Sequence, residues 1–306
     1  MTTRLRVVVL TPVPAVGLEL LRERFAVEVG GHAAGAAAIV TDPSIPVGAD
    51  LLDSAGSSLK VVANFGVGYD NIDLDAARVR GVRVTNTPGV LTNATAELAV
   101  ALMLATARRI AEADATVRSG EWARSDAEEL IGRELAGATV GLVGFGRIAR
   151  RVAELLRGFD VRLLVTSRSG GAPSPGLERL ELPELLAASD FVSVHVPLTA
   201  ETRHLIDANA LAAMKPGAIL INTSRGAVVD TAALIHALRS GHLGAAGLDV
   251  YENEPHVPSE LRELRGTVLL PHIGSATAAT RDAMARLCAD NVIAVLDGRD
   301  PLTAVV

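Results

Sequence analysis

Short apolar runs, many of them β-branched, alternate along the chain with stretches in which apolar residues recur at helical spacing. In the first third, apolar runs predict strands at 6–10, 38–40, 59–65 and 82–86, and helical spacing predicts helices near 15–24 and 73–80. Strands that read as continuous apolar runs are typical of parallel sheets, because helices cover both faces of such sheets. The first third therefore indicates an α/β unit.

The middle of the chain repeats this alternation with more sharply bounded runs. It predicts strands at 139–144, 161–167, 191–196, 218–222, 245–250 and 267–270, and helices near 147–157, 183–188, 208–214 and 231–239. Two longer helical patterns, at 95–110 and 277–296, flank this region. The first follows the candidate caps Thr92 and Asn93, and the second stops at Gly298. The middle thus indicates a second α/β unit.

The two long helices divide the chain into two predicted domains. Residues 1–94 plus 277–306 form one domain and residues 95–276 the other, because the chain leaves the first domain along one long helix and returns along the other. The expected fold class is α/β, with two doubly wound parallel-sheet domains and an interdomain cleft in which a ligand binds.

Composition narrows the possible functions. Of the 306 residues, 49% are apolar, which suffices for substantial cores. The densest apolar stretch, 98–105, is far too short to cross a bilayer, so we expect no membrane association. The net charge of −6 with dispersed Arg residues disfavours nucleic-acid binding. The single Cys288 excludes an internal disulfide and favours a reducing, cytoplasmic location.

A glycine motif follows the strand predicted at 139–144. Gly144, Gly146 and Ala149 have the G-x-G-x-x-A spacing, between that strand and a helix. The first glycine permits a tight turn, the second lets the backbone approach a pyrophosphate, and the small third residue allows close helix packing. The strand–turn–helix–strand context is complete, so the sequence predicts a Rossmann dinucleotide site with the anion at the helix N-terminus.

The next strand lacks the acid that usually binds the ribose of NAD. Thr166, Ser167 and Arg168 stand there instead. A carboxylate would repel a ribose 2′-phosphate, whereas Ser167 and Arg168 could bind it. We therefore expect a preference for NADP(H), with NAD(H) still possible; the alternative is that Arg168 is a solvated loop residue.

Reactive side chains follow three later strands. Arg225 comes directly after the strand at 218–222, the acids Asp249, Glu252 and Glu254 end or follow the strand at 245–250, and His272 follows the strand at 267–270. Ligands bind at the carboxyl ends of strands in open α/β sheets. A cation to hold a carboxylate, a His to transfer a proton and an acid to orient that His together predict carbonyl reduction. No metal is expected.

Several motifs in order make the chain similar to the D-isomer-specific 2-hydroxyacid dehydrogenase family over essentially its full length. The motifs are VGYDNID (67–73), NTPGVLTNATAEL (86–98), GLVGFGRIA, HVPLT, INTSRGAVVD, GLDVYENEP and LLPHIGSAT. Within the family the chain most resembles the glyoxylate/hydroxypyruvate reductases. The resemblance implies a flavodoxin-like substrate domain and a Rossmann cofactor domain.

The resemblance also implies roles for individual residues. Arg225 would bind the substrate carboxylate, Glu254 would pair with His272, and His272 would donate the proton to a small 2-oxo acid. The backbone amides of Val67 and Gly68 would hold the carboxylate as well. Glu252 has no implied role and is expected at the surface. The expected cofactor contacts are Thr95, Gly144, Gly146, Arg147, Ile148, Ser167, Arg168, His195, Val196, Pro197, Thr202, Thr223, Ser224, Asp249, His272 and Gly274.

Other activities of the same scaffold stay open at this point. D-lactate, phosphoglycerate and phosphite dehydrogenases resemble this chain too, and a dinucleotide-sensing binding protein without catalysis is a further alternative. The apolar helix at 95–110 favours a homodimer through the cofactor domain, as in proteins that resemble this one. The alternative is that this helix is buried within one chain.

Overall fold

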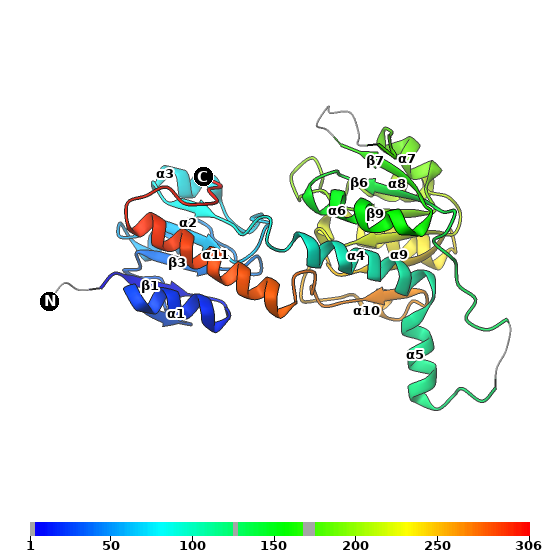
Figure 1. Cartoon of the computed structure of the whole chain (residues 1–306), viewed down its shortest axis with the longest axis horizontal. Helices are drawn as coiled ribbons and strands as arrows, with labels where there is room; N and C mark the ends of the chain where they lie inside the picture. Colours follow the sequence, from blue (N-terminus) through cyan, green and yellow to red (C-terminus); the bar gives the residue numbers. More distant parts are fainter. Residues whose placement is uncertain (1–3, 125–127, 168–174) are drawn as a thin grey trace. The chain divides into compact units, whose positions relative to one another are not determined.

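The chain forms two compact units (Figure 1). The computed structural model describes residues 4–124, 128–167 and 175–306. Unit 1 comprises Met1–Leu91 and Ser275–Val306, and unit 2 comprises Thr92–Gly274. The first boundary lies three residues before the predicted one, and the second lies two residues before the predicted one.

Unit 1 is built on a parallel sheet with the order β2-β1-β3-β4-β5. Its strands are β1 (Arg6–Val9), β2 (Ala26–Val29), β3 (Ala38–Thr41), β4 (Val61–Asn64) and β5 (Arg83–Thr85). Its helices are α1 (Ala15–Arg24), α2 (Ala49–Ala55), α3 (Leu74–Val79) and α11 (Ala278–Leu296). The order 2-1-3-4-5 is that of flavodoxin-like folds, which confirms the expected class. The edge strand β2 was not predicted, because its pattern is largely exposed.

The C-terminal helix α11 belongs to unit 1, where it contacts α1 and β4 (Figure 1). Thr277 caps it by accepting a hydrogen bond from the Thr280 amide, and its buried side includes Met284, Cys288 and Val292. Burial raises the pKa of the Cys288 thiol to about 12, so this core thiol stays protonated at neutral pH.

Unit 2 is built on a seven-stranded parallel sheet with the order β12-β11-β10-β9-β6-β7-β8. Its strands are β6 (Thr139–Val143), β7 (Arg162–Thr166), β8 (Leu177–Arg179), β9 (Phe191–Val194), β10 (Ala218–Asn222), β11 (Leu243–Leu248) and β12 (Thr267–Leu269). Read from β8, the order is the doubly wound Rossmann arrangement, and the direction of winding reverses between β6 and β9. Ligands of such sheets bind outside the carboxyl ends of the strands at that reversal.

Helices cover both faces of this sheet. The helices of unit 2 are α4 (Thr92–Ala107), α5 (Ile110–Ser119), α6 (Arg147–Leu156), α7 (Leu182–Ala188), α8 (Ala208–Ala213), α9 (Thr231–Arg239) and α10 (Ser259–Arg262), with short 3₁₀ turns at η1 (Arg157–Phe159) and η2 (Gly226–Val228). The single helix predicted at 95–110 is therefore wrong at its C-terminal end. Arg109 adopts a left-handed φ of 52°, which stops α4, and α5 begins at the next residue.

The apolarity of α4 is explained within unit 2. This helix packs against α6 and the sheet, and Ala96, Ala99, Leu102 and Met103 are at most 1% exposed. None of the residues of α5 is buried. Large apolar side chains are instead exposed on α5 and the segment after it: Ile110, Val117, Trp122 and Ile131 are between 53% and 65% exposed.

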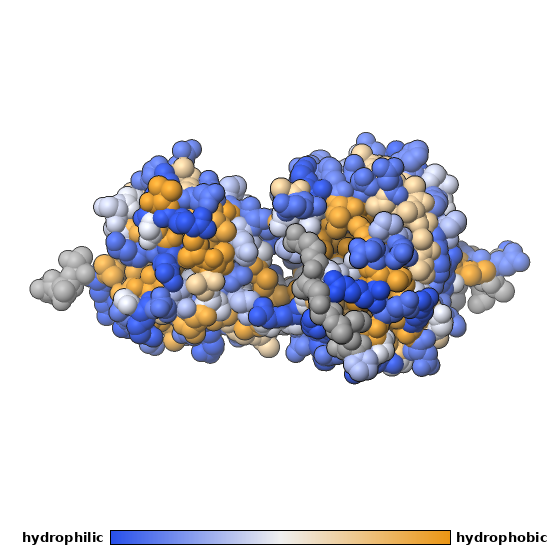
Figure 2. Space-filling view, turned by 90° about the horizontal axis from the view of Figure 1, so that it is seen from above, coloured by the Kyte–Doolittle hydropathy of each residue, from blue (hydrophilic) through white to orange (hydrophobic). Residues whose placement is uncertain are grey.

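Polar surface surrounds smaller apolar areas on the face shown in Figure 2. Among the described helices, none combines the length and apolarity needed to cross a bilayer.

Candidate active site

The glycine turn after β6 has the geometry that its sequence predicts. Gly144 has a φ of 90°, and its amide donates to the carbonyl of Thr166 at the end of β7 (3.0 Å). A Cβ at this position would lie 3.0 Å from the Val196 backbone nitrogen. Both the backbone conformation and this close approach therefore require glycine.

The turn leads directly into the N-terminus of α6. Gly146 precedes the first helical residue, Arg147, and no side chain described in the structure caps this end. Among the described residues, no atom lies within 4 Å of the place that a Cβ of Gly146 would occupy. Ala149, one turn further on, is completely buried. Uncapped amides, open space and a positive helix end fit the pyrophosphate of a dinucleotide.

The end of β7 is where the sequence predicts the choice between NAD and NADP. Thr166 closes the strand, and the carbonyl of Ser167 accepts a hydrogen bond from the guanidinium of Arg179 on the neighbouring β8. Arg168 lies outside the described residues. Arg179 was not selected from the sequence, because only the formation of β8 brings it beside β7.

The residues after β9 form one wall of the glycine turn. His195 Nε2 lies 2.9 Å from the Ser193 hydroxyl, and burial lowers the pKa of His195 to about 4, so the ring is neutral at neutral pH. Thr202 donates to the carbonyl of Pro197 (2.6 Å) and accepts from the Thr199 amide (2.8 Å). The Thr202 hydroxyl thus closes the turn that carries these residues.

Arg225 follows β10 in a turn organised by Asn222. Asn222 Oδ1 accepts from the amide and the hydroxyl of Ser224 (3.0 and 2.8 Å), and Asn222 Nδ2 donates to the carbonyl of Arg225 (2.9 Å). The side chain of Asn222 therefore holds both Ser224 and Arg225 in this turn. Asn222 was missed from the sequence, where it reads as the last residue of a buried strand.

Glu254 and His272 form a direct pair. His272 Nδ1 lies 2.7 Å from Glu254 Oε2, and the Tyr251 amide donates to Glu254 Oε1 (2.8 Å). Burial raises the pKa of Glu254, but His272, the Tyr251 amide and the charge of Arg225 outweigh it, so the pKa lies below its ordinary value. Glu254 is therefore a carboxylate at neutral pH, and Nε2 of His272 is the nitrogen that this pair leaves for proton transfer.

Asp249 holds the segment that follows His272. Its carboxylate accepts from the amides of Ile273 and Gly274, both at 2.7 Å, and Thr95 on α4 donates to the Gly274 carbonyl (3.0 Å). Burial raises the pKa of Asp249, and the two amides and His272 only partly offset this effect. Asp249 thus anchors the backbone beside a histidine whose own φ of 53° is left-handed.

Three consecutive strands position these groups. Arg225 follows β10, Asp249 and Glu254 follow β11, and His272 follows β12, and these strands are neighbours in the sheet. Since all three are parallel, their carboxyl ends lie on one edge. In unit 2 the structure therefore places the predicted cation, acid and histidine on this edge.

In unit 1 the loop after β4 carries Val67 and Gly68. The Asn86 side chain donates to the carbonyl of Val67 (2.8 Å), and the Asn64 side chain donates to the carbonyl of Gly68 (2.7 Å). These bonds hold the loop by its carbonyl oxygens. Neither asparagine was selected from the sequence.

Comparison with known proteins places this geometry in a family. Residues 100–274 match the D-isomer specific 2-hydroxyacid dehydrogenase, NAD binding domain. The chain is 52% identical over 271 residues to a glyoxylate reductase of Thermococcus litoralis, which covers 86% of this chain and 82% of that protein. The chain belongs to the D-isomer-specific 2-hydroxyacid dehydrogenase family.

Other relatives of this dehydrogenase extend over nearly the whole chain. A glyoxylate reductase of Thermococcus onnurineus is 46% identical and covers 98% of this chain and 95% of its own length. An NADPH-dependent glyoxylate/hydroxypyruvate reductase of Sinorhizobium meliloti, solved with NADP and malonate, has a TM-score of 0.92 at 38% identity, covering 99% and 97%. The TT0316 protein of Thermus thermophilus has a TM-score of 0.93 at 46% identity, covering 99% and 100%.

In the part of the chain that the structure describes, no three His, Cys, Asp or Glu residues lie close enough together to hold a metal ion. The polar groups at the strand ends are a cation, a carboxylate and an imidazole, which suit proton transfer and carboxylate binding.

Proposed function

We propose that this protein reduces a small 2-oxo acid, of the glyoxylate/hydroxypyruvate class, to the D-2-hydroxy acid with a nicotinamide cofactor. The observation that carries the proposal is the Glu254–His272 pair on the same sheet edge as Arg225, in an NAD-binding domain. The relatives named glyoxylate reductase support the substrate class.

The described residues fit a dinucleotide. The Gly144–Gly146 turn and the uncapped start of α6 would hold its pyrophosphate. Neutral His195 would form an apolar side of the same site. When bound, the reduced nicotinamide supplies the hydride.

The side chains of the protein carry out the remaining chemistry. Arg225 binds the carboxylate of the oxo acid and orients its carbonyl group. His272 donates a proton from Nε2 to the carbonyl oxygen as that oxygen gains charge, and the new O–H bond completes the alcohol. Glu254 holds Nδ1 of His272, which fixes the orientation of the ring before transfer. Val67 and Gly68 are the proposed contacts in unit 1.

A panel of 2-oxo acids tests this function. Glyoxylate, hydroxypyruvate, pyruvate and longer analogues are each mixed with NADH or NADPH, and the loss of absorbance of the reduced cofactor is followed. We expect the highest kcat/KM with glyoxylate or hydroxypyruvate. If no oxo acid is reduced while the cofactor still binds, the protein is a dinucleotide-binding protein and the proposal is wrong.

NADP(H) is the proposed cofactor. Ser167 and Arg168 stand where an acid would exclude the 2′-phosphate, and the Sinorhizobium meliloti relative was solved with NADP. Arg168→Ala should raise KM for NADPH while sparing KM for NADH. Equal changes with both cofactors would contradict the choice.

The protein is further proposed to form a homodimer through unit 2 and to be located in the cytoplasm. The exposed apolar side chains of Ile110, Val117, Trp122 and Ile131 support self-association through α5 and the segment after it, rather than through the buried α4. Light scattering coupled to size exclusion should give twice the 31.7 kDa mass of one chain. The buried, lone Cys288 supports a reducing compartment.

A further inference from the structure

A second carboxylate–imidazole pair lies in unit 2 beside the Glu254 loop. His204 Nε2 is 2.6 Å from Glu252 Oε1, and Arg203 Nη2 is 3.1 Å from the same oxygen. The hydroxyl and amide of Thr231, at the start of α9, also donate to Glu252. The side chain of Glu252 is only 19% exposed, less than expected of a surface residue without a role.

The charge state of Glu252 agrees with this set of donors. Burial raises the pKa of Glu252, but the hydrogen bonds from His204 and Thr231 outweigh it and lower the pKa below its ordinary value. Glu252 is thus an ionised acceptor for three residues at neutral pH.

This pair joins the two turns that carry Arg225 and Glu254. The His204 amide donates to the carbonyl of Ala227 (2.8 Å), two residues after Arg225. A Cβ on Gly226 would lie 1.8 Å from the Tyr251 carbonyl carbon and 2.3 Å from the Glu252 nitrogen. The backbone next to Arg225 is therefore in direct contact with the Tyr251–Glu252 peptide.

The preceding Val250–Tyr251 peptide orients Glu254. The Tyr251 amide donates to Glu254 Oε1, while Oε2 faces His272. The two peptides share the Cα of Tyr251, so a shift of the Tyr251–Glu252 peptide would also move the Tyr251 amide and turn Glu254 away from His272. His204 has a left-handed φ of 50°, a conformation that a non-glycine residue keeps only where surrounding contacts enforce it.

We propose that His204 and Glu252 are positioning residues, which hold the Tyr251–Glu254 loop against the Gly226 turn and so keep Glu254 directed at His272. The proposal rests on the proposed function, because its effect on turnover acts through Glu254.

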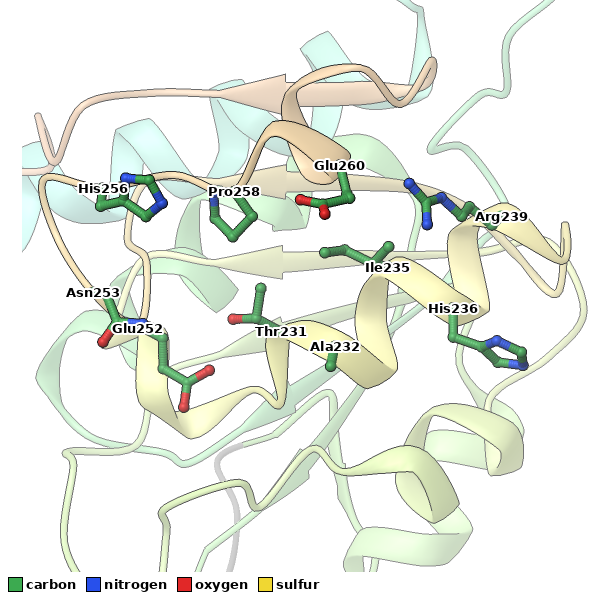
Figure 3. Close-up of a pocket in the computed structure, with 10 residues that line it drawn as sticks. All are labelled: Thr231, Ala232, Ile235, His236, Arg239, Glu252, Asn253, His256, Pro258 and Glu260. Carbon is green, nitrogen blue, oxygen red and sulfur yellow. The ribbon is translucent and has the colours of Figure 1, made fainter.

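Glu260, labelled in Figure 3, offers a matched control. Glu252 and Thr231 line a pocket of about 500 Å³ between α9 and residues 252–260, and Glu260 lines the same pocket on α10. Glu260→Gln removes an acid from this surface without touching the pair. It should leave kcat and KM for glyoxylate unchanged.

The test compares His204→Leu, His204→Gln and Glu252→Gln in the full-length protein. We expect His204→Leu to lower kcat on the order of tenfold, because small misplacement of catalytic groups is costly, with a much smaller change in KM. His204→Gln retains an amide donor and should recover most of the loss. A kcat for His204→Leu equal to wild type would overturn the proposal.

A double-mutant cycle shows whether the effect passes through Glu254. In a Glu254→Gln background, His204→Leu should lower kcat by less than about twofold, since the residue being positioned is already gone. Independent, multiplying losses would mean that His204 has only a structural role. If His204→Leu does not fold, Glu252→Gln takes its place in the cycle.

Carboxyl NMR separates failure of this proposal from failure of the proposed function. In the wild type the Glu254 carboxyl should titrate below the usual range of Glu, and in His204→Leu nearer to that range. This readout needs no turnover. If the wild type reduces no 2-oxo acid, the proposed function is wrong. The positioning role is rejected by a different result, namely that the Glu254 carboxyl titrates alike in wild type and in His204→Leu.

Discussion

The charge on Glu254 can be removed with little change in shape. Glu254→Gln keeps an oxygen that accepts from the Tyr251 amide, so the loop after β11 should stay in place. It replaces the carboxylate that faces His272 Nδ1 at 2.7 Å by an uncharged group. The substitution therefore tests the contribution of the ion pair and not that of the fold.

The exposure of the pair limits the size of the expected effect. Hydrogen bonds to charged groups contribute about 1.5–3 kcal/mol. The side chains of His272 and Glu254 are 40% and 32% exposed, so solvent screening favours the lower end, about 1.5 kcal/mol. If the whole of this energy stabilises the transition state, kcat should fall about tenfold.

The assay is the initial rate of NADPH oxidation at saturating glyoxylate, with Glu260→Gln as an acidic control on the same unit. We expect kcat to fall and KM to change little, because Glu254 acts on the proton donor rather than on the substrate. A kcat within twofold of wild type, or a loss confined to KM, would refute the assigned role of Glu254.

Three further predictions concern neighbouring groups. His272→Ala should lower kcat by roughly 10²–10⁴-fold, the usual contribution of a positioned acid, and near-normal turnover would remove His272 from the mechanism. Arg225→Lys keeps the charge but loses the bidentate fork, so steady-state kinetics should show a strongly raised KM for the oxo acid. Burial lowers the pKa of His195 from 6.5 to about 4, so its contribution to stability should be complete above pH 6.5 and lost as the pH falls towards 4. Because the residue is partly exposed, the loss should be at most about 3 kcal/mol; denaturant titrations should show it in wild type and not in His195→Gln.

Much of the fold follows from local pattern. Buried strands such as β6 and β10 are continuous apolar runs. A strand of this kind is apolar on both sides, so it predicts a sheet with helices packed on both faces. The strands β2 and β8 were missed, because none of their residues is buried and neither is a continuous apolar run. The break at Arg109 was missed as well, since no glycine or proline in the sequence marks its left-handed φ.

In the candidate site, too, some residues could be predicted from local pattern and others could not. Arg225, Glu254 and His272 could be selected because each follows a recognisable strand, and parallel strands bring such residues to one edge. Asn222 and the His204–Glu252 pair could not be selected, since a residue that orients a neighbour has no motif of its own. Their partners are set by turn geometry and by sheet order, which local pattern does not contain.

The order of β10, β11 and β12 explains why the supporting residues matter for this site. The sheet fixes where each of the three strands ends, but each functional side chain stands three or more residues beyond its strand, on a turn that the sheet no longer holds. Side-chain acceptors hold these turns in place: Asn222 in the Arg225 turn, Glu252 in the Glu254 loop and Asp249 in the segment after His272. A reductase built this way can lose activity through any of these three acceptors while its core, and hence its fold, stays intact.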